Sequence, residues 1–127
     1  MQTAHAAGDL RTVALAGTRL GRVLRALGRL DAARAEVAKA REWFRTAGGG
    51  DGALLASHLA AVLDGDEPAL RGVLDAARAA GDHEVELLTL DQLARMCGDA
   101  ASARELRADA EALYPSVAHL VTDEDRA

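Results

Sequence analysis

The sequence predicts an all-α protein, and its composition carries that prediction. Of its 127 residues, 30 are Ala and 19 are Leu, whereas Ile is absent and Phe, Trp and Tyr together make up only 2%. Ala and Leu favour helices, whereas strands are enriched in β-branched and aromatic residues. No segment alternates apolar and polar residues over the length of a strand, so we expect no sheet.

Glycine, often followed by aspartate, marks the expected helix ends. Gly-Asp pairs begin at Gly8, Gly65, Gly81 and Gly98. Glycine can end a helix in the left-handed conformation, and the aspartate can then cap the next helix. Gly28 and the glycine-rich stretch 47–52 are further breaks. The sequence therefore predicts six helices, over residues 10–27, 30–46, 53–64, 67–80, 83–97 and 100–114.

Apolar residues recur at helical spacing within these ranges. In the first range the apolar stripe consists of Val13, Ala16, Leu20, Val23, Leu24 and Leu27, opposed by Arg11, Thr18, Arg22 and Arg25. In the second range the stripe consists of Leu30, Ala33, Val37, Ala40 and Phe44. This is the pattern of amphipathic helices, whose apolar stripes are expected to face a core.

The charge and the apolar runs exclude several classes of protein. The net charge of −5 argues against a dedicated nucleic-acid-binding domain, which needs a clustered basic excess. The single cysteine excludes an internal disulfide framework. No apolar run approaches the ~20 residues of a membrane span, and no signal peptide opens the chain. We therefore expect a small cytoplasmic helical domain.

A helical hairpin recurs along the chain. Residues 4–9 are nearly copied at residues 77–82, and a looser copy occupies residues 45–51. The glycines expected between the two helices of each hairpin are Gly28, Gly65 and Gly98, which are 37 and 33 residues apart. This period predicts antiparallel helix pairs repeated about three times.

On these residues the chain resembles the tetratricopeptide repeat (TPR), a unit of about 34 residues made of two antiparallel helices. In a unit that starts at Ala14, the motif positions fall on Leu20, Gly21, Gly28, Ala33 and Ala40. In a unit that starts at Glu84, they fall on Leu90, Asp91, Gly98, Ala103, Ala110 and Pro115, with Asp91 in place of the family's glycine. The resemblance implies a short TPR-like α-solenoid of about three stacked hairpins. An unrelated helical bundle is the alternative.

The resemblance also implies an organisation and a packing rule. Residues 1–9 form the end of a preceding helix or an N-terminal extension, residues 10–117 the repeat domain, and residues 118–127 an acidic C-terminal tail. Small residues allow the helices of a hairpin to approach closely, so we expect Gly21 to face Ala33 and position 91 to face position 103.

No pattern of catalytic or metal-binding residues is present. His5, His58, His83 and His119 do not fall at metal-ligand spacing, and no other Cys and no His lies within a turn of Cys97. No nucleophile motif occurs, and the glycine-rich stretch 47–52 lacks the Lys-Ser/Thr pair of a phosphate loop. We therefore expect no enzyme activity, no metal and no cofactor.

In the TPR register the inner groove is lined by first-helix residues. These positions are Thr18, Arg22, Arg25, Leu55, Leu59, Val62, Gln92, Arg95 and Met96. Such a groove has guanidinium groups at its ends and an apolar middle, which suits an acidic or amphipathic peptide or helix. The alternative is that the arginines cover solvated faces and that Leu55 and Leu59 belong to the core.

The sequence thus predicts a protein–protein interaction module. Its composition is rich in alanine and has many more arginines than lysines. In this it resembles the helical-repeat segments of large bacterial transcriptional regulators of the LuxR-type and ATP-binding classes. The resemblance implies a regulatory scaffold segment that does not itself contact nucleic acid or membrane. Two other functions remain open, a structural domain that forms homo-oligomers and a small-molecule-binding helical domain.

Overall fold

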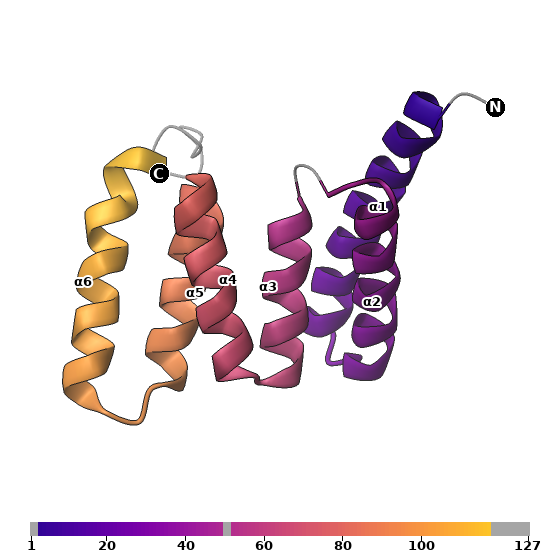
Figure 1. Ribbon diagram of the computed structural model, residues 1–127. Coiled ribbons are helices and arrows are strands. Elements are labelled where there is room, and N and C mark those ends of the chain that lie inside the picture. The colour runs from indigo at the N-terminus through magenta and orange to yellow at the C-terminus, as the bar shows by residue number, and fades with distance from the viewer. Residues whose placement is uncertain (1–2, 50–51, 118–127) are drawn as a thin grey trace, which may run out of the picture. The chain divides into compact units, whose positions relative to one another are not determined.

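The structure is a computed structural model that describes residues 3–49 and 52–117, so the expected acidic tail at 118–127 lies outside the described residues. The described residues form six α-helices and no strand (Figure 1). The helices are α1 (Thr3–Ala26), α2 (Leu30–Thr46), α3 (Ala53–Asp64), α4 (Glu67–Ala80), α5 (His83–Met96) and α6 (Ala100–Val117). The prediction of an all-α protein is confirmed, and α2 to α5 begin and end within one residue of their predicted bounds.

The helices belong to two compact units, residues 1–66 and residues 67–127. In the first unit, which we call unit 1, α1 packs against α2, and both helices contact α3. In the second, unit 2, α5 packs against both α4 and α6. Short connections join neighbouring helices within each unit, so these helices run antiparallel (Figure 1).

The Gly-Asp rule for helix ends is confirmed at several junctions. Gly65 and Gly81 adopt positive φ values of 60° and 69°, the left-handed conformation expected of them. The carboxylate of Asp82 accepts a hydrogen bond from the backbone N–H of Val85 at 3.1 Å, so Asp82 caps α5. Asp99 accepts from the N–H and the hydroxyl of Ser102 at the start of α6.

The same rule is wrong at two junctions. Helix α1 runs without a break through Gly8 and Asp9, because glycine permits a helix to end but does not force it to. Gly98 is not among the described glycines with positive φ, since α5 already ends at Cys97, whose backbone is extended. At the other end of the chain α6 continues to Val117, beyond the predicted end, with Pro115 in its last turn.

Two glycines of α1 face α2, and one of them sets the distance between the two helices. A methyl group added at Gly17 would lie 3.5 Å from the Cβ of Ala40, an ordinary contact. A methyl group at Gly21 would lie only 2.5 Å from a methyl carbon of Val37 and 3.6 Å from the carbonyl oxygen of Ala33. The predicted close approach of Gly21 to the second helix is therefore confirmed.

Close packing on this glycine face reverses the predicted orientation of α1. Ala14 and Thr18, on the same face as the glycines, are fully buried. Most of the predicted core stripe instead faces outward, since Leu20, Val23 and Leu27 are 45%, 54% and 66% exposed. Leu24 is the exception, because it is half-buried and packs against the core cluster of unit 1. The prediction is thus wrong for the other large residues of the stripe, because large side chains cannot occupy a helix contact as close as that at Gly21.

In unit 2 the core contains a partly buried ion pair. Leu70, Leu90 and Leu93 are almost completely buried and come from α4 and α5. Beside them Glu86, only 8% exposed, accepts from Nε of Arg78 at 3.0 Å. Arg78 also lies 3.6 Å from the carboxylate of Asp109, so one guanidinium links α4, α5 and α6.

The expected glycine contact is not repeated in unit 2. Ala103 is buried, as predicted, but Asp91 is exposed and pairs with Arg95 at 3.0 Å. A charged side chain is more stable in water than in a close helix contact, so position 91 does not reproduce the role of Gly21.

None of the helices in the described part of the chain is both long enough and apolar enough to cross a membrane.

Candidate functional site

Two of the nine predicted groove residues belong to the core of unit 1. The Thr18 side chain is fully buried, and its hydroxyl donates a hydrogen bond to the carbonyl oxygen of Ala14 at 2.9 Å. Leu59 is 5% exposed and packs in a cluster with Ala33, Val37 and Leu63. Because neither side chain is accessible, both are core residues and not part of an open groove.

The other predicted residues divide between the two units. Arg22 and Arg25 are exposed on α1, and Leu55 and Val62 are half-buried on α3, all in unit 1. The remaining three lie on α5 in unit 2, where Gln92 and Met96 are half-buried and Arg95 is exposed.

The structure brings three of the predicted residues together around one groove. This groove, which we call the Arg22–Arg25 groove, has a volume of about 380 Å³. It is lined by Arg22, Arg25, Ala26, Leu30, Val62 and Leu63. The two guanidinium groups come from successive turns of α1, whereas the apolar wall comes from α3 and the first residue of α2. The groove therefore combines positive charge with an apolar surface.

The charges of this groove are not neutralised within unit 1. Neither Arg22 nor Arg25 forms an ion pair with a carboxylate among the described residues. Their effect appears at His58 on α3, whose pKa is lowered to about 4, first by burial and then by the positive charges of Arg25 and Arg22. His58 is therefore neutral at pH 7. The positive charge at the groove is then that of Arg22 and Arg25.

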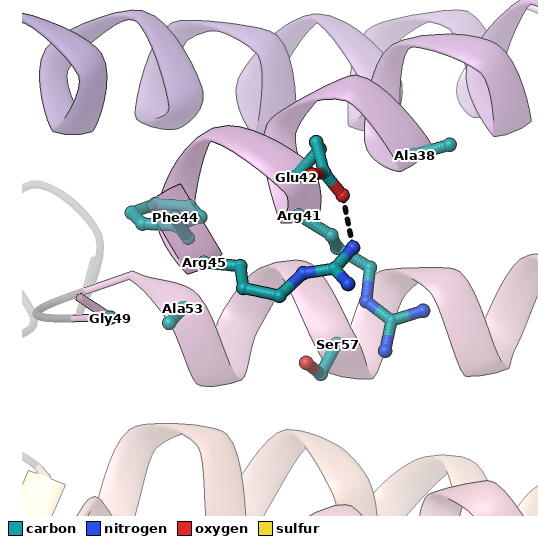
Figure 2. Close-up of a pocket in the computed structure, with 8 residues that line it drawn as sticks. All are labelled: Ala38, Arg41, Glu42, Phe44, Arg45, Gly49, Ala53 and Ser57. Atoms are coloured by element: carbon teal, nitrogen blue, oxygen red, sulfur yellow. Dashed lines mark hydrogen bonds and ion pairs between the residues drawn. The ribbon is translucent and has the colours of Figure 1, made fainter. Parts of the chain in front are cut away.

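A second groove lies between α2 and α3, and sequence reasoning missed it. This groove, the Arg41–Arg45 groove, has a volume of about 670 Å³. It is lined by Ala38, Arg41, Glu42, Phe44, Arg45, Gly49, Ala53 and Ser57. Figure 2 shows the side chains of Arg41 and Arg45 extending from α2 toward Ser57 on α3.

The two grooves differ in net charge. In the Arg41–Arg45 groove, Arg45 forms an ion pair with Glu42, so one of the two positive charges is neutralised (Figure 2). The Arg22–Arg25 groove contains no carboxylate. An anionic group is therefore attracted more strongly to the Arg22–Arg25 groove, although that groove is smaller.

The second groove was missed because the TPR register assigns groove positions to the first helix of each hairpin. The signal was present in the sequence, since Arg41 and Arg45 are four residues apart and so lie on one face of α2. Their face could be identified only once the packing of α2 against α3 was known.

Within residues 3–49 and 52–117, no group of three His, Cys, Asp or Glu side chains is arranged to hold a metal ion. Comparison of the chain with protein-family models, with curated proteins and with solved structures found no match.

Proposed function

We propose that the protein is an interaction module that binds an acidic, amphipathic peptide or partner helix. The observation that carries this proposal is the Arg22–Arg25 groove, where two unpaired guanidinium groups stand beside an apolar wall. A guanidinium group binds a carboxylate through two parallel hydrogen bonds, which is stronger than a contact between neutral groups. The wall of Leu30, Val62 and Leu63 offers apolar surface for a neighbouring side chain of the same ligand.

The ligand that fits this groove carries acidic and apolar residues close together. A single carboxylate would use the arginines but leave the apolar wall exposed to water, whereas an apolar ligand would leave the arginines unpaired. An amphipathic peptide with Asp or Glu next to Leu or Val satisfies both. A nucleic acid needs many phosphates neutralised by a clustered basic surface, whereas this groove is lined by two arginines, so a short acidic peptide fits it better.

The wider proposal follows the resemblance to TPR proteins. Antiparallel helices with close glycine contacts are the arrangement that such repeats use, and they support assignment of the chain as a TPR-like scaffold. In this proposal the chain is a non-enzymatic, cytoplasmic segment of a larger bacterial regulator. Binding of an acidic partner would then be its regulatory input.

Peptide binding tests the proposal. The probe is a labelled synthetic helix of about 20 residues, with Leu at steps of three and four and Glu at the flanking positions, followed by fluorescence anisotropy. We expect Arg22→Glu and Arg25→Glu each to weaken binding at least tenfold, about 1.4 kcal/mol, without lowering the melting temperature. The control is Arg107→Glu, which makes the same charge change at an exposed site on α6.

A further variant tests the part of the predicted groove that lies in unit 2. We expect Arg95→Glu to leave the affinity for the peptide unchanged, because Arg95 lies on α5 in unit 2 and already pairs with Asp91. If the Arg22, Arg25 and Arg107 variants all lose the same affinity, the peptide responds only to overall charge and the groove assignment is wrong.

A further inference from the structure

The outer face of α1 is an apolar surface without a partner in unit 1. Among residues 9–49, 52–113 and 115, whose side chains the structure describes, the exposed large apolar side chains are Val13, Leu20, Val23, Leu27 and Leu30, at 44–66% exposure. Val13, Leu20 and Val23 lie on α1, Leu27 lies in the turn that follows it, and Leu30 begins α2. We call this set the α1 stripe. Isolated exposed apolar residues are normal, but five in one row mark an interaction surface.

The spacing of the α1 stripe matches that of a helix–helix contact. Within α1 the exposed apolar residues Val13, Ala16, Leu20 and Val23 follow steps of three and four residues. This is the spacing of the a and d positions of a coiled coil. Residues 13–26 of α1 span about 20 Å at 1.5 Å per residue, enough for roughly three to four turns of a second helix.

Positive charge flanks the stripe. Arg19 lies three residues after Ala16 and four before Val23, so it is next to the stripe on the helix surface. Arg29 lies in the turn between Leu27 and Leu30. Neither arginine forms an ion pair among the described residues, and Asp9 is the one acidic residue within α1.

These charges decide between two possible occupants. In a symmetric pair of α1 helices, each copy would bring its own arginines to the contact, and like charges would oppose one another. A helix with acidic residues beside its apolar row avoids this repulsion, because its carboxylates would lie next to the arginines.

We infer that the α1 stripe is a docking surface for an acidic amphipathic helix, which lies along α1 with its Asp and Glu residues next to Arg19 and Arg29. The inference deepens the proposed function, since it rests on the same class of partner but names a second surface and the partner's conformation. The two surfaces are continuous, because Leu30 belongs to the α1 stripe and also lines the Arg22–Arg25 groove.

The test compares two peptides and two pairs of substitutions. The first peptide is the Glu-flanked helix described above, and the second is identical except for Lys in place of each Glu. The double variant Leu20→Gln/Val23→Gln removes the centre of the stripe, and Arg22→Glu/Arg25→Glu removes the charge of the groove. Leu20 and Val23 are both about half exposed, so we expect the Leu20→Gln/Val23→Gln variant to keep its fold. Circular dichroism measures this.

We expect the unmutated protein to bind the Glu-flanked peptide at least tenfold more tightly than the Lys-flanked one. The Leu20→Gln/Val23→Gln variant should bind the Glu-flanked peptide at least tenfold more weakly than the unmutated protein does. Loss with this variant but not with Arg22→Glu/Arg25→Glu supports the stripe and overturns the groove. The reverse result supports the groove and overturns the stripe. The inference is overturned if the two peptides bind equally tightly, or if neither peptide binds.

Two further measurements keep the result clear. Methyl NMR of the unmutated protein should show shifts at Val23 and Leu27 when the Glu-flanked peptide is added, and their absence contradicts docking on the stripe. Sedimentation of the protein without peptide should show no dimer. If a dimer does form and Leu20→Gln/Val23→Gln abolishes it, the occupant of the α1 stripe is a second copy of the chain.

Discussion

Gly17 and Gly21 lie one turn apart on α1 and face the same helix, yet the structure gives them different roles. At Gly17 there is room for a methyl group beside Ala40, whereas at Gly21 the side chain of Val37 already occupies that space. Gly21 is therefore required for the observed approach of α1 to α2, and Gly17 is only compatible with it.

This difference gives a matched pair of substitutions. Gly17→Ala should leave the free energy of unfolding unchanged or raise it by up to about 1 kcal/mol, because alanine favours helix more than glycine. Gly21→Ala should lower it by about 1–3 kcal/mol despite the same gain in propensity, because Val37 is buried and must move. Urea denaturation of the two variants measures both changes. Equal effects would contradict the close contact.

A second prediction concerns how His58 makes the stability of the protein depend on pH. Its pKa is about 4 in the folded protein and about 6.5 in the unfolded chain. The unfolded chain therefore takes up a proton as the pH falls below 6.5, whereas the folded protein does not until about pH 4. The contribution of neutral His58 to stability is fully present above pH 6.5 and is lost as the pH falls toward 4.

The measurement compares the protein with His58→Gln, which stays neutral. Between pH 7 and pH 5 the unfolding free energy of the unmutated protein should fall further than that of the variant. NMR titration of the His58 ring should give a midpoint near 4. A midpoint near 6.5 would show that His58 is neither buried nor close to the arginines. Addition of the Glu-flanked peptide should raise this midpoint, because a bound carboxylate offsets the charges of Arg22 and Arg25.

Sequence reasoning located these residues but did not assign their environment. The TPR register identified Gly21 and Ala33 as small contact residues, and it assigned Thr18, Arg22 and Arg25 to the groove. Thr18 is instead buried, and its hydroxyl donates to the carbonyl oxygen of Ala14 within the helix. Burial of this kind depends on packing that spacing alone does not reveal.

At the scale of helices, one arginine of unit 2 connects three elements. Arg78 on α4 contacts the buried carboxylate of Glu86 on α5 and the carboxylate of Asp109 on α6. A buried carboxylate without a partner is costly, so this contact constrains how the three helices pack.

Removal of the arginine tests that role. Arg78→Ala should lower the free energy of unfolding by about 1–3 kcal/mol, because buried Glu86 loses its guanidinium partner and keeps only the more distant His83 ring at 3.7 Å. The control, Arg71→Ala, removes an arginine that pairs with Glu67 on the surface of the same helix, and should cost no more than about 0.5 kcal/mol. Thermal denaturation distinguishes them. Equal costs would mean that the Arg78 contact is no stronger than a surface pair.

The bounds of the helices were largely predictable, whereas the orientation of α1 was not. The glycine pattern located α2 to α5 because Gly28, Gly52, Gly65 and Gly81 adopt positive φ values at the junctions of these helices. The pattern failed at Gly8, although Asp9 follows it, because glycine permits a helix to end but does not force it to. It also failed to orient α1, since both faces are apolar and only one is small enough for contact with α2.

At the scale of the whole molecule, charge is divided unevenly along the chain. Residues 1–66 contain 9 Lys and Arg against 7 Asp and Glu, a net charge of +2, whereas residues 67–127 contain 6 against 13, a net charge of −7. The overall value of −5 therefore conceals a basic unit 1, which includes both arginine grooves and the α1 stripe. The net charge of the whole chain therefore does not indicate this candidate binding surface.

The division predicts how binding responds to salt. Because the screening length falls from about 10 Å at 0.1 M salt to about 3 Å at 1 M, the affinity for the Glu-flanked peptide should fall several-fold over this range. The Arg22→Glu/Arg25→Glu variant should show a smaller dependence. Isothermal titration at several NaCl concentrations measures both. An affinity independent of salt would mean that the arginines take no part.

Thiol reactivity measures most directly which face of α1 is buried. In a Cys97→Ser background, Thr18→Cys places a thiol of similar size at a fully buried site, and Val23→Cys places one at a site that is 54% exposed. We expect the Val23→Cys thiol to react with a water-soluble disulfide reagent nearly as fast as a free thiol, and the Thr18→Cys thiol at least 100-fold more slowly, since opening of the fold must come first. Fast reaction at position 18 with protection at position 23 would contradict the orientation of α1, and with it the groove and the stripe.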